Sequence, residues 1–297
     1  MKYTLNQLKE LKKVFPNTGL THLWNIPDDV PDVAEEVTIS TEVDPRTLEM
    51  EKLVFKQGNV PPLTIENDLV QFIEFSTRGQ RLCSMWIDLH RGRITSSIFG
   101  QVLRAGSSPN SLINNIIEGS SLHKYSSLPP AVKWGQEHEN EAKQQYIALK
   151  SVFGDVVVEE TGLTLCASHS FLGASSDGKV RDAGDEGVLE IKCPFSLKGK
   201  AVNKMEIQEI VTLSDPTFCL VQGNDGPKLR HDHDYYAQVQ GEMALMGLPW
   251  CDFVVWTNAK CGNIFIERIL FDADYVTRMM PKLIAFYVEN VIPKLAL

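Results

Sequence analysis

The chain of 297 residues lacks several patterns that would assign it to a common class of protein. It has no apolar run long enough to cross a bilayer, and its first residues lack the uninterrupted apolar core of a secretory signal. Its six cysteines are scattered and form no Cys-x-x-Cys pair. We therefore expect an intracellular protein without membrane association, disulfide framework or iron–sulfur cluster, located in the nucleus if the source is eukaryotic.

The signatures of several enzyme classes are also missing. There is no phosphate-cradling Gly-x-x-x-x-Gly-Lys, no dinucleotide fingerprint and no Gly-x-Ser-x-Gly elbow. The net charge of −9 argues against binding of nucleic acid over the whole surface. Basic residues are nevertheless concentrated between Ser76 and Arg104 and again between Lys192 and Lys204. Each stretch is either a solvated surface or a track for phosphates.

The pattern changes at about residue 75. Residues 1–75 are predicted to be an extension, with a short amphipathic helix carrying Leu5, Leu8 and Leu11 and then loops and short strands rich in proline and acid. Residues 76–297 are predicted to form a compact α/β unit. Helices are expected around residues 80–89, after Ser96 or Ser97, over 131–152 and 234–246, and from 272 onward. Strands are expected near residues 156–160, 163–167, 172–180, 188–193, 251–256 and 264–270.

The most informative stretch is Leu189-Glu-Ile-Lys-Cys-Pro194. Side chains alternate along a strand, so Glu190 and Lys192 must point to the same face. A carboxylate that can hold a metal ion, beside an amine that can hold a water, is what a metal-dependent phosphodiesterase requires. The pair alone also occurs by chance, and its meaning depends on the flanking residues.

Two further carboxylates are candidates to join this pair. Glu139 lies at helical spacing from Ala142 and Tyr146, which predicts an inward position, although an edge position paired with an arginine is the alternative. Asp177 precedes a glycine, as turn residues often do, but it lies one hairpin before Glu190, with residues 185–187 as the expected turn. Asp177, Glu190 and Glu139 could therefore converge on Mg²⁺ or Mn²⁺.

The cluster His231-Asp-His-Asp234 resembles a metal-binding box, but we assign it another role. Asp234 is predicted to cap the helix that follows, and the histidines to lie in a loop. One stripe of this helix carries Tyr235, Gln238 and Glu242, polar groups that could orient water or phosphate beside a metal site.

Five blocks, taken in order, resemble the YqaJ-like viral recombinase family, which includes phage lambda exonuclease. The resemblance runs from about Trp86 to about Gly247, and a tail beginning Pro249-Trp-Cys-Asp looks most like versions found in animal genomes. The blocks are Trp86…Gly92-Arg-Ile-Thr-Ser-Ser97, Trp134-Gly-x-x-x-Glu139-Asn, Gly173-Ala-Ser-Ser-Asp-Gly178, Leu189-Glu-Ile-Lys-Cys-Pro-Phe195 and Tyr235-Tyr-Ala-Gln-Val-Gln-Gly-Glu242.

This resemblance implies a restriction-endonuclease-like fold, with a mixed central sheet flanked by helices, and Mg²⁺-dependent hydrolysis of DNA from a 5′ end. It also implies DNA as the partner, with a single-strand annealing protein and a homo-oligomer as further possibilities. Asp177, Glu190 and Glu139 match the metal-binding acids, and Lys192 matches the lysine that positions the attacking water. Ser97, Ser175, Tyr235 and Gln238 match residues that line the site or contact the 5′-phosphate.

The chain departs from the family pattern where a phosphate-binding arginine is usual. His90 falls at that position, so the role is altered or passes to Arg91 or Arg93. Ser176 also replaces the usual proline before the aspartate. An exonuclease is the leading hypothesis, a structure-specific endonuclease on the same fold is the second, and a non-catalytic DNA-binding recombination partner is the third.

Overall fold

The computed structural model describes residues 44–56, 60–119, 129–200, 218–224, 226–260 and 262–295. The helix expected near Leu5 and Leu8 lies outside these residues, as does Cys261. The five described cysteines are free. Among the helices of the described part, none is long and apolar enough to cross a membrane.

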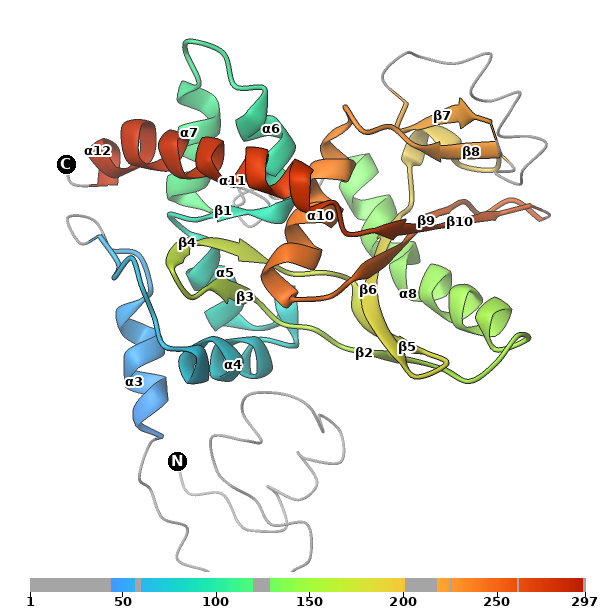
Figure 1. The fold of residues 1–297 in the computed structure, drawn as a ribbon, viewed down its shortest axis with the longest axis horizontal. Helices are drawn as coiled ribbons and strands as arrows, with labels where there is room; N and C mark the ends of the chain where they lie inside the picture. Colours follow the sequence, from blue (N-terminus) through green and yellow to red (C-terminus); the bar gives the residue numbers. More distant parts are fainter. Residues whose placement is uncertain are drawn as a thin grey trace, which may run out of the picture.

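A five-stranded sheet with the order β10-β9-β6-β5-β2 forms the centre of the molecule (Figure 1). Its strands are β2 (Val156–Glu159), β5 (Gly178–Asp182), β6 (Asp185–Lys192), β9 (Trp250–Trp256) and β10 (Ile264–Leu270). β6 and β9 are parallel and the other neighbours are antiparallel, so the sheet is mixed, as predicted. Every residue of β9 is buried, as expected of an inner strand covered on both faces.

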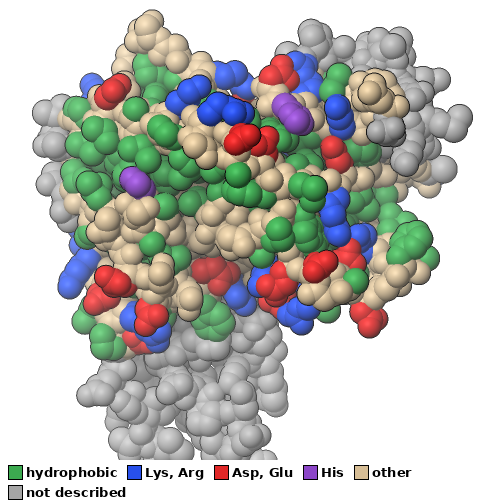
Figure 2. Space-filling model, in the orientation of Figure 1, with side chains coloured by type: hydrophobic (Ala, Val, Ile, Leu, Met, Phe, Trp, Pro, Cys, Tyr) green, Lys and Arg blue, Asp and Glu red, His purple; other side chains and the backbone are tan. Residues whose placement is uncertain are grey.

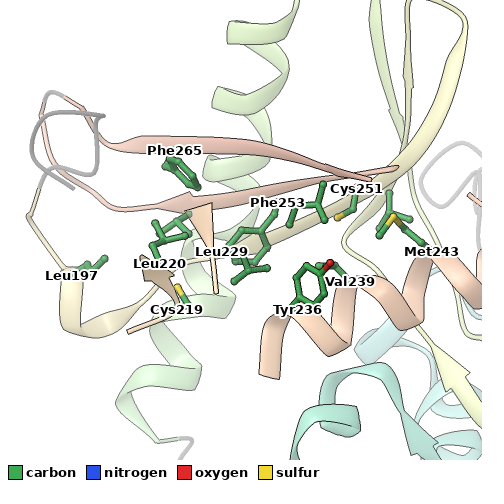
Figure 3. Packing of buried hydrophobic residues seen from close by; sticks show 13 residues of the cluster. Leu197, Cys219, Leu220, Leu229, Tyr236, Val239, Met243, Cys251, Phe253 and Phe265 are labelled. Atoms are coloured by element: carbon green, nitrogen blue, oxygen red, sulfur yellow. The ribbon is translucent and has the colours of Figure 1, made fainter. Parts of the chain in front are cut away.

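Two helices cover opposite faces of this sheet. Helix α10 (Asp234–Met246) packs on one face, where Phe253 and Val239 belong to the core shown in Figure 3. Helix α8 (Pro130–Lys150) packs on the other face, where Tyr146 and Leu189 share a second core. Because side chains alternate along β6, Glu190 points with Val188 toward α10, whereas Leu189 points toward α8.

A smaller three-stranded sheet, β1-β4-β3, lies on the other side of α10 (Figure 1). Its strands are β1 (Ile94–Thr95), β3 (Thr164–Cys166) and β4 (His169–Ala174), and a hairpin is formed by β7 (Leu220–Gly223) and β8 (Gly226–Leu229). The remaining elements are α3 (Pro45–Lys52), α4 (Asn67–Ser76), η1 (Gln80–Leu82), α5 (Ser84–His90), η2 (Ser96–Ile98), α6 (Phe99–Leu103), α7 (Asn110–Glu118), η4 (Phe195–Leu197), α11 (Ala273–Phe286), η5 (Tyr287–Val291) and α12 (Ile292–Leu295).

Several local predictions were wrong in detail. The strand expected over 172–180 is two strands, β4 and β5, with Asp177 between them. The turn before β6 is not at 185–187 but at Ala183 and Gly184, which both have positive φ (52° and 92°). Helix α10 is capped by His233, whose ring accepts a hydrogen bond from the Tyr235 amide, and not by Asp234.

The segment before residue 76 also differs from the prediction. Where loops and short strands were expected, the described residues form the helices α3 and α4. Met50 of α3 and Ile73 of α4 share a buried core with Leu89 and Leu163, which lie in the part predicted to be compact. These two helices therefore pack directly against the α/β unit.

Candidate active site

The site lies at the carboxyl end of β6, where the loop before β5 is fastened to this strand. The Asp177 amide donates to the carbonyl of Leu189 (3.1 Å), and Oδ2 of the Asp177 carboxylate accepts from the Ile191 amide (2.6 Å). Lys143, on α8, donates to the Asp177 carbonyl (2.6 Å). These contacts hold the half-buried Asp177 beside Glu190, as predicted for neighbouring strands.

Glu190 and Lys192 meet on one face of β6, in a network with α10. Nζ of Lys192 donates to Oε1 of Glu190 (2.5 Å) and to Oε1 of Gln238 (3.1 Å). The Gln238 amide donates to Glu190 (2.6 Å) and to Glu242 (2.9 Å), and the Ser96 hydroxyl also donates to Glu242 (3.1 Å). The second oxygens of Glu190 and Glu242, both buried, have no hydrogen-bond partner.

This concentration of acids perturbs the titration of the whole site. Burial and the nearby Asp177 carboxylate raise the pKa of Glu190 to about 7. Burial and the charge of Glu190 raise the pKa of Glu242 well above its usual value. Burial lowers the pKa of Lys192, but the interactions with Glu190, Tyr235 and Asp177 together outweigh burial and raise the pKa of this ammonium. Lys192 is therefore charged at neutral pH and compensates part of the negative charge.

Glu139 reaches the site from α8. It lines a pocket of about 240 Å³ together with Lys192 and Tyr235, yet its side chain is 34% exposed and lies 3.5 Å from Nη2 of Arg81. Burial and the Asp177 carboxylate raise the pKa of Glu139. The structure thus places Glu139 at the edge of the inward face of α8 and paired with an arginine, the alternative considered from the sequence.

The residues expected to contact phosphate are placed in different ways. Nδ1 of His90 lies 2.7 Å from the carbonyl of Trp86, and the imidazole ring packs against the Trp86 ring at a tilt of 40°, with the centroids 3.7 Å apart. Burial lowers the pKa of His90 to about 4, so the imidazole is neutral. Arg91 is exposed and lies 3.6 Å from Asp88. Ser97 is exposed, and Ser175 accepts a hydrogen bond from the Trp86 indole (2.9 Å).

The prediction that Arg93 contacts phosphate requires correction. Its side chain is 2% exposed, and its guanidinium donates to the carbonyls of Leu53 (2.7 Å), Leu89 (2.7 Å) and Ser170 (2.9 Å). Burial lowers the pKa of Arg93 to about 10, which still leaves it charged at neutral pH. Arg93 therefore holds three backbone segments together and does not face a ligand.

Comparison with known families confirms the predicted family resemblance. Residues 85–249 match the model of the YqaJ-like viral recombinase domain, which is more than half of the chain. The chain belongs to the YqaJ-like viral recombinase family. None of the curated protein sequences matches it. The match begins one residue before Trp86 and ends at Pro249, so α3 and α4 precede the matched YqaJ-like domain.

Two solved proteins share the fold of the YqaJ-like chain. LHK-Exo, an alkaline exonuclease from Laribacter hongkongensis, is 24% identical over 71% of this chain and 94% of its own, with a TM-score of 0.52, and its complex with dAMP gives the same values. A SOX–DNA complex is 13% identical over 77% of this chain and 73% of its own, with a TM-score of 0.55. These similarities confirm the predicted restriction-endonuclease-like architecture.

The YqaJ-like site contains residues that sequence reasoning did not assign. Glu242 is a fourth carboxylate of the site and is buried next to Glu190; the sequence placed it on the stripe with Gln238 but did not assign it to ion binding. Arg81 and Lys143 supply positive charge beside Glu139 and Asp177, but only the structure shows where they point. Tyr235 and Gln238 both lie beside Lys192: the Tyr235 ring is 4.5 Å from its Nζ, and Gln238 accepts a hydrogen bond from it.

The donor set fits a hard divalent cation. Such ions prefer carboxylate oxygens, and the buried oxygens of Glu190 and Glu242 without partners are available ligands. In the described part of the chain, no three histidine, cysteine or acidic side chains lie close enough as they stand to hold an ion. Lys192 and Arg81 instead contact Glu190 and Glu139. Binding of an ion by these acids therefore requires side-chain movement.

Proposed function

We propose that the chain is a Mg²⁺-dependent deoxyribonuclease, also active with Mn²⁺, that hydrolyses phosphodiester bonds from the ends of duplex DNA in the 5′ to 3′ direction. The observation that supports this best is the arrangement of Asp177, Glu190 and Lys192 at one end of β6, within a YqaJ-like domain. Asp177 and Glu190 lie close enough for the charge of one to raise the pKa of the other, and a bound cation would relieve this repulsion. In a protein that binds no cation, burial of two such carboxylates would only reduce stability.

Asp177, Glu190 and Glu139 would hold the ion. When bound, Mg²⁺ supplies a Lewis acid that stabilises negative charge on the phosphoryl oxygens. Lys192 is placed to orient water, because an ammonium has three N–H groups and only two are used, by Glu190 and Gln238. Gln238 fixes Lys192 from α10, so the direction of the third N–H is determined by the fold.

One of the two alternatives has specific support. A structure-specific endonuclease is favoured by the neutral His90, since a neutral ring is a poor substitute for a terminal-phosphate arginine. A non-catalytic DNA-binding partner in recombination is disfavoured by the buried carboxylates, which repel phosphate in the absence of a cation. A single-strand annealing protein and a second copy of the chain stay predictions from the family resemblance.

The test is digestion of end-labelled duplexes, with and without a 5′-phosphate, beside a covalently closed circle. An exonuclease degrades the duplexes in Mg²⁺ and spares the circle, whereas cleavage of the circle supports the endonuclease. DNA binding in EDTA without cleavage in Mg²⁺ supports the non-catalytic partner.

Variants assign the activity to this site. Asp177→Asn keeps the acceptor for the Ile191 amide but removes a charge, and Lys192→Ala removes the ammonium. Each should reduce cleavage at least about 100-fold, the usual scale for loss of a charge-stabilising group. Lys179→Ala is the matched control, because Lys179 on β5 pairs with Glu186 (2.8 Å). This variant should cut DNA at the wild-type rate. Full activity of both site variants contradicts the assignment.

A further inference from the structure

The 3₁₀ turn η1 is fixed against the loop that carries Asp177. The side-chain amide of Gln80 donates to the carbonyl of Thr161 (3.0 Å) and to that of Ser176 (2.8 Å), the residue before Asp177. Gln80 has a φ of 45°, in a region that residues with a side chain rarely adopt. An unfavourable conformation held by two long-range hydrogen bonds indicates that the fold determines where η1 lies.

The next residue, Arg81, is thereby placed at the edge of the acidic site. Its Nη2 lies 3.5 Å from Oε2 of Glu139, and its side chain is 41% exposed. Its charge also reaches the second acid: burial raises the pKa of Asp177, whereas the Arg81 guanidinium, among other cations, lowers it. Arg81 is therefore a solvent-accessible cation within electrostatic reach of two candidate ion-binding acids.

The contact between Arg81 and Glu139 is loose. It consists of one N–O approach of 3.5 Å, longer than the usual charge-assisted hydrogen bond. Three residues earlier, Arg78 makes three contacts of 3.0–3.2 Å with Glu74. A partly exposed pair with a single long contact contributes little to stability, so the guanidinium can exchange its partner at low cost.

The other described arginines of the basic stretch have partners away from the acids. Arg93 is bound to three backbone carbonyls, Arg91 lies beside Asp88, and Arg104 pairs with Asp234 (2.6 Å). Among the described arginines of this stretch, Arg81 is the one that forms an ion pair with a candidate ion-binding acid. On the face shown in Figure 2, acidic and basic side chains are interspersed.

We propose that Arg81 binds a backbone phosphate of DNA next to the bond that is cut, a role that rests on the proposed nuclease function. A guanidinium offers two parallel N–H groups that match two phosphate oxygens. DNA that approaches Asp177, Glu190 and Glu139 needs a cation at the edge of these acids. Participation of Glu139 in ion binding would release Arg81 to make this contact.

The test compares Arg81→Gln and Arg81→Lys with Arg78→Gln, an arginine of the same segment that pairs with Glu74. DNA binding is measured in EDTA over a series of salt concentrations, and KM and kcat are measured in Mg²⁺ with a labelled duplex. Arg81→Gln should raise KM about tenfold with kcat nearly unchanged, and should lower the salt slope by about 0.9, the contribution of one phosphate contact. Arg81→Lys should have a KM and a salt slope between those of Arg81→Gln and the wild type, and Arg78→Gln should match the wild type in both.

The two proposals fail in different ways. A salt slope and KM of Arg81→Gln equal to those of the wild type overturn the role of Arg81. A fall in kcat alone also overturns it, because Arg81 would then act through Glu139. If the wild type binds DNA but cuts none in Mg²⁺, the nuclease function is wrong, while the salt slopes still decide whether Arg81 contacts phosphate.

Discussion

Replacement of Arg93 by methionine tests most directly whether this arginine stabilises the fold or contacts DNA. Methionine fills much of the same space but leaves the carbonyls of Leu53, Leu89 and Ser170 without a donor. Each buried carbonyl without a partner costs about 1–3 kcal/mol. The variant no longer pays the desolvation cost of a buried guanidinium, which offsets a few kcal/mol of this loss of stability. The net loss of stability should therefore be about 4 kcal/mol, or roughly 10 °C in melting temperature for a chain of this size.

The assay is thermal or urea unfolding, followed by DNA binding at a temperature where both proteins are folded. Arg91→Met is the matched control, because Arg91 is exposed and its pair with Asp88 is worth less than about 1 kcal/mol. Arg93→Met should bind DNA with wild-type affinity once folded. The reasoning is refuted if Arg93→Met melts with the wild type and loses affinity for DNA, since Arg93 would then reach phosphate after all.

Three further predictions follow from burial and space. Without metal, the free energy of unfolding should fall by up to about 3 kcal/mol as the pH rises from about 5 to 7. The reason is that the pKa of Glu190 is about 7 in the folded state against 4.5 in the unfolded state, so the folded state prefers the protonated acid. Urea unfolding in EDTA at pH 5 and pH 7.5 measures this change, and equal stability at the two pH values contradicts it. Glu190→Gln should raise the melting temperature in EDTA at pH 7.5 and abolish the upward shift caused by Mg²⁺, and a retained shift would place the ion elsewhere. Gly241→Ala should cost about 1–3 kcal/mol, because an added Cβ would lie 2.4 Å from the Phe99 ring. Gly135→Ala, inside α8 with nothing within 4 Å of the added Cβ, should instead unfold at a higher denaturant concentration than the wild type, by up to about 1 kcal/mol of helix propensity.

The centre of the site was predictable because local periodicity determines it. Glu190 and Lys192 are two residues apart on a strand, so their shared face follows from strand geometry alone. Glu139 follows from helical spacing to Ala142 and Tyr146, both fully buried. What periodicity could not supply was the partner of each group, because Gln238 and Arg81 reach the site from segments distant in sequence.

The errors have equally definite causes. Prolines and acids before residue 76 suggested loops, although Asp44 followed by Pro45 is a typical start of a helix, and Asp44 does cap α3. Arg93 lies in a basic stretch, and an arginine in such a stretch is typical of a phosphate contact. Its acceptors Leu53 and Ser170 are 40 and 77 residues away, so its burial depends on tertiary packing that the local sequence does not encode.

Gln238 has a consequence for how this domain could change over time. Its single amide joins Glu190 on β6 to Glu242 on α10, so one layer of the molecule is fastened to the next through the side chains that the proposed chemistry uses. A descendant that abandoned cleavage could exchange either acid for glutamine and keep an oxygen that accepts from the Gln238 amide. An apolar residue at either position would instead leave a buried N–H of Gln238 without an acceptor between sheet and helix, so loss of charge is tolerated here more easily than loss of polarity.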